Sequence, residues 1–180
     1  MNGDVDVKTM RIFGTIIASG CLAVVAGCGD AAATDEDDPP ALTTEAAQAI
    51  VTPFYDALNR PATKDVATLL SEATRDDWLS CAGNDTCLPK DKVIAAFMAR
   101  GAAVPDLGWA IENVEVAGNQ IVVRSQATGT PAAEFMGVAM TGKSFHIMAI
   151  DVHTIENGKM VKSYHIEDWA GALQQLSASP

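Results

Sequence analysis

The stretch that decides the fold is residues 144–168, SFHIMAIDVHTIENGKMVKSYHIED. Two runs rich in β-branched and aromatic residues flank the dipeptide Asn157-Gly158, which favours the two-residue turn of a β-hairpin. If these two residues form the turn, Glu156 faces Lys159, and the residue numbers of every cross-strand pair add up to 315. The sequence therefore predicts a long antiparallel hairpin with a defined register.

This register assigns the side chains of the hairpin to two faces. The first face holds His146, Met148, Ile150, Val152, Val161, Ser163, His165 and Glu167. The second face holds Phe145, Ile147, Ala149, Asp151, His153, Lys162, Tyr164, Ile166 and Asp168. On the first face, apolar side chains surround two histidines, a serine and a carboxylate, a mixture expected of a ligand cavity. We predict that the first face is the pocket wall and that the second is partly solvated. A bulge near residue 166 would move Asp168 across.

The segments before the hairpin extend this pattern. Residues 111–117 and 121–129 also resemble strands and are joined by Gly118-Asn119, a second dipeptide suited to a tight turn. They therefore predict further antiparallel strands beside the hairpin, in a run that begins at Trp109.

Helical periodicity precedes the strands. Apolar residues recur at intervals of three and four over residues 46–58, after Thr43 or Thr44 as the cap. Shorter helices are expected at residues 64–70 and 89–100, the second of them ending at Gly101. Helices followed by antiparallel strands indicate an α+β fold, in which the helices cover one face of a curved sheet. A cone-shaped sheet with a pocket is one natural outcome.

The first thirty residues have the order of an export signal. Lys8 and Arg11 form a basic start, residues 12–25 are almost uncharged and apolar, and small residues precede Cys28. The apolar stretch is shorter than the ~20 residues that a membrane-spanning helix needs, so we expect a cleaved signal peptide over residues 1–27. The run Val-Ala-Gly-Cys resembles the bacterial lipobox, which implies that Cys28 receives a lipid and becomes the first residue of the mature chain.

Two alternatives stay open for this segment: an ordinary secretory signal in which Cys28 is incidental, and a start of translation at Met10 instead of Met1. Both still export the chain. We expect it in the cell envelope, lipid-anchored to a bacterial membrane on the periplasmic or cell-surface side.

An acidic segment follows the signal. Residues 28–41 combine the lipidated cysteine with small, acidic and proline residues, a composition typical of a flexible tether. The formal net charge of the chain is −11, and five negative charges lie in this tether while the signal is balanced, which leaves −6 on the domain at residues 42–180. This charge disfavours a nucleic-acid partner.

Two cysteines lie within the domain, Cys81 and Cys87, on either side of a short polar loop. In an oxidising compartment such a pair favours a disulfide. A metal site would need further ligands at close spacing, and no histidine is near in sequence. Asp151 and His153 likewise lack a third ligand at a recognisable spacing, so no metal is predicted.

Several segments together resemble the SnoaL-like polyketide cyclases, also called ester cyclases, over most of residues 45–177. The segments are Ala127-Thr128-Gly129-Thr130, Glu134-Phe135-Met136-Gly137-Val138, Thr141-Gly142-Lys143, Ile150-Asp151-Val152, Glu156-Asn157-Gly158-Lys159-Met160-Val161 and 168–176. The resemblance implies a fold like that of nuclear transport factor 2, a cone of curved antiparallel sheet closed by helices. It also implies that two copies can pair through the outer face of the sheet.

Characterised members of that family close a ring by intramolecular aldol chemistry, with an acidic residue that moves a proton and with no metal or organic cofactor. The family often has Trp-Asp where this chain has Tyr164-His165, and it commonly retains an aspartate at the position of Asp168. Histidine keeps a proton-transfer group at residue 165 but changes the charge that a substrate meets.

The candidate catalytic residues are therefore His165, Asp168 and His146. Each has a structural alternative: the histidines can be hydrogen-bonded within a half-buried sheet, and Asp168 can cap a helix over residues 169–176. The predicted pocket residues are Met148, Ile150, Val152, Ser163, Tyr55, Trp78 and Trp109.

Two functions are consistent with the sequence. The first is binding of a small apolar or aromatic ligand in the cone, with cofactor-independent acid–base chemistry of the cyclase or isomerase type at His165 and Asp168. The second is a non-catalytic ligand-binding or protein-interaction module of the cell envelope, because one fold supports many functions.

Overall fold

The computed structural model describes residues 41–178, and the predicted signal peptide, Cys28 and nearly all of the tether lie outside this range. The elements in chain order are α1 (Thr44–Leu58), the 3-10 helix η1 (Pro61–Thr63), α2 (Val66–Ala73), β1 (Thr74–Cys81), β2 (Cys87–Pro89), α3 (Lys90–Ala103), β3 (Gly108–Ala117), β4 (Gln120–Gly129), β5 (Phe145–Glu156), β6 (Lys159–Glu167) and α4 (Trp169–Ser177). Among residues 41–178, no helix is long and apolar enough to cross a membrane.

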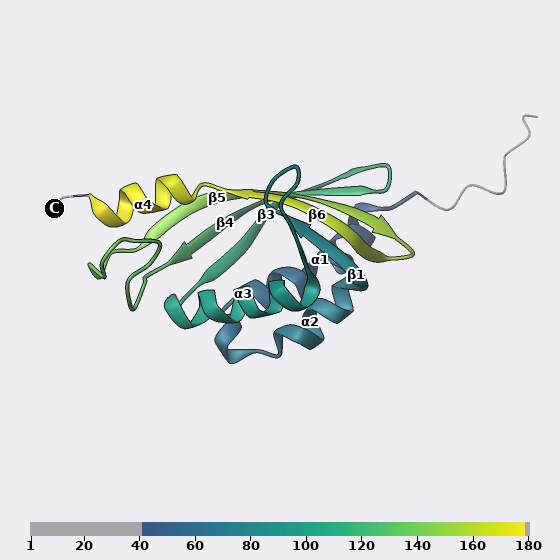
Figure 1. Ribbon diagram of the computed structural model, residues 1–180. Coiled ribbons are helices and arrows are strands. Elements are labelled where there is room, and N and C mark those ends of the chain that lie inside the picture. Colours follow the sequence, from purple (N-terminus) through teal and green to yellow (C-terminus); the bar gives the residue numbers. More distant parts are fainter. Residues whose placement is uncertain (1–40, 179–180) are drawn as a thin grey trace, which may run out of the picture. The chain divides into compact units, whose positions relative to one another are not determined.

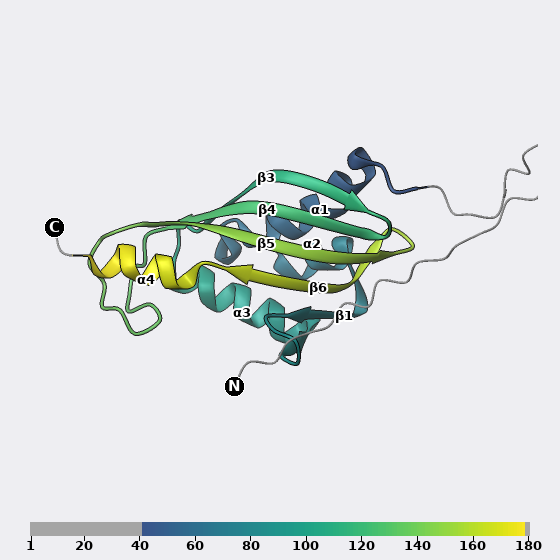
Figure 2. The same ribbon diagram turned by 90° about the horizontal axis from the view of Figure 1, so that it is seen from above.

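The strands form one curved, unclosed sheet in the order β2-β1-β6-β5-β4-β3. Helices α1, α2 and α3 cover one face of this sheet, and the other face carries no helix in the described range (Figures 1 and 2). Helix α4 follows β6 directly and lies at one end of the sheet. The predicted α+β class is confirmed, with the helices in one layer and the sheet in the other.

Strands β1 and β2 were not expected from the sequence, and they make the sheet mixed instead of purely antiparallel. Strand β1 pairs with β6 in parallel, for example at Ser80 and Ser163, while β2 pairs with β1 antiparallel. Strand β1 has the sequence TRDDWLSC, which lacks a regular apolar alternation and therefore does not indicate a strand. The predicted disulfide between Cys81 and Cys87 is present, and it joins directly opposed residues of β1 and β2.

The turn of the long hairpin is confirmed, because Asn157 and Gly158 both have positive φ (50° and 72°) as a type I′ turn requires. The predicted register holds only beside the turn, where Glu156 pairs with Lys159 and Ile155 with Met160. Val161 is then an extra residue, and the next pair is Thr154 with Lys162. This bulge shifts the rest of β6 by one residue, so the predicted faces are wrong for the remainder of the hairpin.

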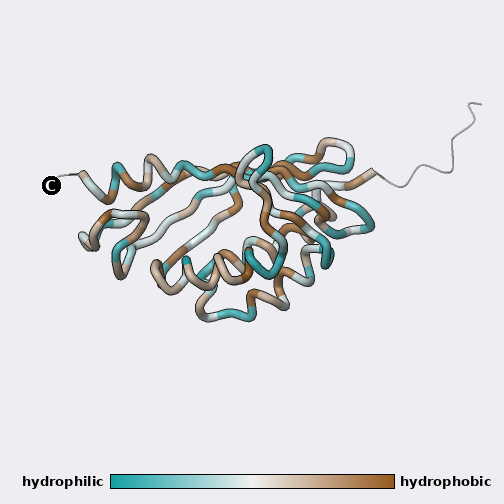
Figure 3. The backbone as a smooth tube through the Cα atoms, viewed as in Figure 1, coloured by the Kyte–Doolittle hydropathy of each residue, from teal (hydrophilic) through white to brown (hydrophobic). Residues whose placement is uncertain are grey.

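The hydrophobic core lies between the sheet and the helices. Its largest fully buried side chains include Trp78 of β1, Phe145 of β5 and Leu70 of α2. Hydrophobic residues recur along the strands and the helices, while hydrophilic residues gather at the turns (Figure 3). Burial of this apolar surface is the main term that holds the two layers together.

Two predicted helix boundaries are corrected. The helix expected at residues 64–70 is α2, which starts later because Asp65 caps it by accepting a hydrogen bond from Thr68 N at 3.0 Å. The helix expected to end at Gly101 continues to Ala103. Gly101 is needed for a different reason: a Cβ there would lie 2.6 Å from Pro61 Cγ and 2.9 Å from Ala62 N, so its place is set by the close approach of α3 to η1.

We expect Gly101→Ala to destabilise the domain, although alanine in a helix interior is normally favoured over glycine by about 1 kcal/mol. The added methyl group meets the backbone of η1, which cannot move as freely as a side chain. Urea denaturation should show a lower free energy of unfolding, by on the order of 2 kcal/mol. The control is Ala99→Gly at an exposed position of the same helix, where only the propensity changes. A more stable Gly101→Ala variant would contradict the close packing of α3 on η1.

Candidate functional site

A cavity of about 230 Å³ lies between the inner face of the sheet and the helices. Most of its wall is apolar, and it carries four ionisable side chains: Arg100 from α3, Asp151 from β5, and His165 and Glu167 from β6. The remaining lining residues are Phe54, Leu58, Ser80, Ala82, Thr86, Leu88, Val93, Ala96, Phe97 and Trp109. An apolar cavity with a few convergent polar groups is the usual form of a small-molecule site.

The bulge at Val161 brings the polar groups of the cavity together. Because of the shifted register, Asp151 is directly opposite His165 across the β5–β6 pair. Directly opposed residues of an antiparallel pair project from the same face of the sheet, so both side chains face the helices. In the predicted register they lie on opposite faces.

The predicted pocket wall is wrong for β5. Met148, Ile150 and Val152 alternate with the buried residues of β5 and lie on the outer face, where Met148 is 52% exposed and Ile150 37% exposed. They therefore do not line the cavity. Their predicted partners on β6, Ser163 and His165, do face inward.

The Asp151 carboxyl is buried and accepts a hydrogen bond from the Tyr55 hydroxyl at 2.8 Å. Burial raises the pKa of Asp151 to about 7, and the nearby Glu167 also raises it, whereas the bond from Tyr55 and the charge of His165 oppose the shift. Burial, with the charge of Asp151, raises the pKa of the Tyr55 hydroxyl, so Tyr55 stays protonated and remains a donor. A carboxyl group that gains and loses its proton near neutral pH is suited to general acid–base catalysis.

Behind Asp151 a chain of buried hydrogen bonds runs into the core. The His153 ring lies with Nε2 3.5 Å from the Tyr55 hydroxyl and Nδ1 2.7 Å from Ser163 Oγ. Ser163 Oγ accepts a hydrogen bond from Trp78 Nε1 at 2.9 Å. Complete burial lowers the pKa of His153 to about 3, so its imidazole is neutral at physiological pH. This second inward histidine supports Tyr55 and does not line the cavity.

His165 is paired with a carboxylate. Its Nδ1 lies 2.9 Å from Glu167 Oε1, and Glu167 Oε2 accepts from Trp169 Nε1 at 3.1 Å. The hydrogen bond to Glu167 raises the pKa of His165 although burial opposes it. Burial would raise the pKa of Glu167, but the bond and charge of His165, with the charge of Arg100 and the bond from Trp169, lower it instead. The hydrogen bond and the opposite charges therefore favour the imidazolium–carboxylate form of the pair.

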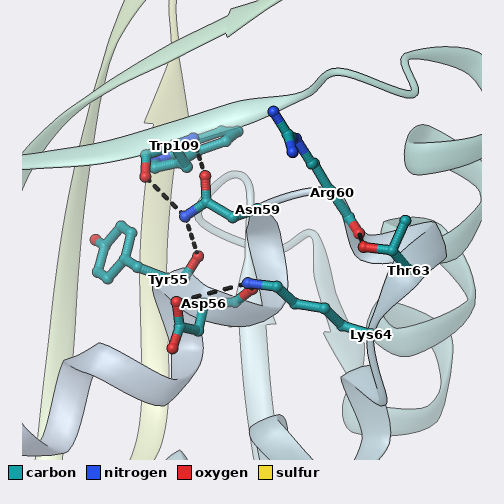
Figure 4. A network of polar contacts seen from close by, with 7 residues as sticks. All are labelled: Tyr55, Asp56, Asn59, Arg60, Thr63, Lys64 and Trp109. Carbon is teal, nitrogen blue, oxygen red and sulfur yellow. Dashed lines mark hydrogen bonds and ion pairs between the residues drawn. The ribbon is translucent and has the colours of Figure 1, made fainter.

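The helical wall of the cavity is fixed to the sheet by Asn59, the residue that follows α1. Its Nδ2 donates to the carbonyl oxygens of Tyr55 (2.9 Å) and Trp109 (2.8 Å), and its Oδ1 accepts from Trp109 N (Figure 4). Trp109 in turn donates from Nε1 to Ser125 Oγ at 2.8 Å. One side chain amide thus ties the last turn of α1 at Tyr55 to β3 at Trp109.

The other predicted residues fall into three groups. Trp109 and His165 line the cavity, and Tyr55, Trp78 and Ser163 are buried behind the lining. Two predicted catalytic residues, His146 and Asp168, lie outside the cavity. His146 is exposed and pairs with Gln126 Oε1 through Nε2 at 2.6 Å, and Asp168 caps α4 by accepting from Gly171 N at 2.8 Å.

Two of the four ionisable side chains of the cavity, Asp151 and Arg100, were not predicted to line it. Asp151 did carry a signal, because a carboxylate within the run of inward residues Ile147, Ala149 and His153 must be buried and is rare without a function. Arg100 carried none, since a cation near the end of a helix is ordinary. Over residues 41–178, no group of three histidine, cysteine or acidic side chains is placed to hold a metal ion.

Comparison with known proteins assigns the family. The family model for the SnoaL-like polyketide cyclases matches residues 49–176. TsrD from Streptomyces laurentii is 22% identical, with a TM-score of 0.65 over 77% of this chain and 99% of TsrD. A candidate SnoaL-like polyketide cyclase from Jannaschia sp. CCS1 is 21% identical, with a TM-score of 0.67 over 79% of this chain and 99% of its own. No curated protein matches the sequence.

The chain therefore belongs to the SnoaL-like polyketide cyclase family. The similar structures establish the fold alone, and they carry different names: IdmH of Streptomyces antibioticus (23% identity, TM-score 0.64, 73% of this chain and 99% of IdmH) is a candidate cyclase. AclR of Streptomyces galilaeus (20% identity, TM-score 0.64, 77% of this chain and 100% of AclR) is a candidate hydroxylase. The fold thus does not fix the reaction, which has to be argued from the cavity.

The buried carboxyl of Asp151 generates a stability prediction. Its pKa rises from 3.8 to about 7 on folding, so the folded state binds more protons than the unfolded state in that window, and the free energy of unfolding falls as pH rises through it. The Asp151→Asn variant has no carboxyl group to ionise, so its free energy of unfolding does not fall for this reason as the pH rises. Its side chain oxygen still accepts the hydrogen bond from Tyr55. We expect the variant to be more stable than the wild type at pH 8, by on the order of 2 kcal/mol.

Urea denaturation at pH 4 and pH 8 checks this prediction, and the gain should be smaller at pH 4. The titration of His153 occurs in both proteins and cancels in the comparison. The control is Asp85→Asn at an exposed position, which should change stability little at either pH. Equal effects of Asp151→Asn at the two pH values would contradict a buried carboxyl that carries a proton.

Proposed function

We propose that the domain binds a small, largely apolar or aromatic molecule and moves a proton on it without a cofactor, as an isomerase or cyclase does. The observation that carries this proposal is the placement of Asp151 and His165 directly opposite each other in one mostly apolar cavity. The pKa of Asp151 is raised to about 7, which makes its carboxylate a stronger base, and the raised pKa of His165 favours the imidazolium as a donor.

In this reaction Asp151 is the base. Its ionised carboxylate takes a proton from a carbon next to a ketone or ester carbonyl of the ligand, and the electron pair of the broken C–H bond moves into an enolate. The hydrogen bond from Tyr55 holds the carboxylate in one orientation. Since Nδ1 of His165 is bound to Glu167, the Nε2–H of the imidazolium is left to donate to the enolate oxygen.

The proton on Asp151 then has two destinations. In an isomerisation it returns to another carbon of the same enolate. In a cyclisation the enolate carbon attacks a second carbonyl of the molecule, a C–C bond forms, and the new alkoxide takes the proton. The aromatic wall formed by Phe54, Phe97 and Trp109 excludes water from the enolate in both cases.

Substitutions at the cavity test this proposal. The measured rate is the exchange of the α-protons of propiophenone, a small aromatic ketone, into D2O, followed by NMR. We expect Asp151→Asn and His165→Gln each to lower the protein-dependent rate by about 100-fold or more. The rate should rise with pH through about 7, where Asp151 loses its proton, and the deprotonation of His165, whose pKa is raised, should lower it.

The matched controls are His146→Gln and Asp168→Asn, which replace the same residue types outside the cavity. Both should keep the exchange rate of the wild type, although Asp168→Asn weakens the cap of α4. A wild-type rate in the Asp151 or His165 variants, or a loss in the two controls, would assign the chemistry elsewhere.

The second candidate function is a binding or interaction module without turnover. The observation that favours it is the apolar outer face of the sheet, where Met148, Ile150, Tyr164 and Ile166 are 37–69% exposed. This is the face on which a second copy of the chain would pack in a homodimer. In that case the substitutions in the cavity change affinity for the ligand, and there is no exchange rate to lose.

We further propose that the chain is exported and lipid-anchored through Cys28 in the cell envelope, with residues 28–41 as the tether. The Cys81–Cys87 disulfide supports an oxidising compartment, since such bonds rarely persist in the cytosol. The ligand would then reach the cavity from outside the cytoplasm.

Lipidation is tested with the full chain expressed in a bacterium that is fed an alkyne-labelled fatty acid. We expect label on the wild type and a membrane-bound protein, and neither label nor membrane attachment in Cys28→Ser. The control is Cys21→Ser within the apolar stretch, which should retain both. A label that persists in Cys28→Ser would contradict the proposed anchor.

A further inference from the structure

Arg100 is the one ionisable group of the cavity that the proposed proton transfer does not use. It lies in the last turn of α3, and its guanidinium carbon is 5.0 Å from the centre of the Trp169 ring. A guanidinium over an aromatic face is held by a cation–π interaction, while its N–H groups remain available as donors. Burial lowers the pKa of Arg100 and the charge of Glu167 opposes this, but a guanidinium stays charged in proteins.

Within residues 41–178, the Arg100 guanidinium donates no hydrogen bond and has no carboxylate oxygen within 4.0 Å. Glu167 is the acidic group that interacts with it, yet both oxygens of Glu167 are taken, one by His165 and one by Trp169. Glu167 thus shares its charge between His165 and Arg100, and within the described residues no carboxylate contacts the guanidinium in this largely apolar cavity. A half-buried cation of this kind is costly unless an anion binds beside it.

We propose, on the basis of the function proposed above, that the ligand is a keto carboxylic acid whose carboxylate binds Arg100 and whose ketone lies between Asp151 and His165. The five N–H donors of arginine match the two oxygens of a carboxylate in a bidentate arrangement. One guanidinium that contacts no carboxylate of the described residues fits one carboxylate of the ligand. A phosphate monoester carries about −1.5 to −2 at neutral pH and would leave negative charge unmatched beside Glu167 and Asp151.

This assignment gives the ligand a defined orientation. The carboxylate is at the α3 side of the cavity, the apolar body lies against Phe54 and Trp109, and the reacting carbon faces the sheet. The carboxylate takes no part in the bond changes, but its binding to Arg100 positions the reacting carbon. Arg100 is in this sense a specificity-determining residue for the proposed reaction.

The experiment compares two ligands that differ only at one end, 3-benzoylpropionate and its neutral amide. Dissociation constants are measured by NMR titration for the wild type, Arg100→Gln, Arg100→Lys and the control Arg124→Gln, an exposed arginine on β4. We expect the wild type to bind the acid about 10- to 100-fold more tightly than the amide. Arg100→Gln should lose this preference with little change for the amide, Arg100→Lys should retain part of it, and Arg124→Gln all of it.

The affinity for the amide also reports whether the cavity is intact, so a misfolded variant is not mistaken for a specific loss. Equal binding of acid and amide by the wild type, or an undiminished preference in Arg100→Gln, would overturn the assignment of Arg100. Proton exchange at the α-carbon of the same acid in D2O is recorded in parallel. Tight, Arg100-dependent binding of the acid without exchange supports the carboxylate site and rejects the proton transfer, whereas binding of neither compound at millimolar concentration rejects both.

Discussion

The cavity depends on one extra residue in β6. Val161 has no partner on β5, and its insertion shifts every later pair of the hairpin by one position. Without that shift Ser163, His165 and Glu167 would lie on the outer face, and the inner face would carry Tyr164 and Ile166 in their place. The bulge therefore decides which face of β6 meets the helices. This local irregularity in backbone pairing thus determines which side chains of β6 the inner face presents to the cavity.

The polar side chains of the inner face lower the stability of the domain. Asp151, His153 and Ser163 are all less than 5% exposed, positions where apolar side chains would add to the core. Each is satisfied by a partner, and over the described residues no fully buried side chain nitrogen or oxygen lacks one. The hydrogen-bonded side chains from Trp78 to Asp151 therefore stay ordered, but they stabilise the fold less than an apolar core of the same volume would. Such an arrangement is typical of a site where preorganised polar groups are kept for function.

The sequence predicted those features that local patterns determine. These features are the Asn157-Gly158 turn, the helix cap at Asp168, the disulfide and the α+β class, and each follows from residues close together in the sequence. The faces of the hairpin could not be predicted in this way, because no glycine or proline marks the bulge at Val161. Strand β1 was missed since its pairing with β6 joins residues more than 80 positions apart and its composition is polar. Arg100 enters the cavity only through the packing of α3, which no local pattern encodes.

The parallel pairing of β1 with β6 has a consequence for how the domain forms. Ser80 and its neighbours in the β1–β2 hairpin contribute to the cavity, yet their strand has no place in the sheet until β6 is available. Formation of the native sheet must therefore wait for nearly the complete polypeptide, since a parallel strand cannot be held by a hairpin turn of its own. The cavity is therefore completed only when β6, the last strand of the described residues, has joined β1.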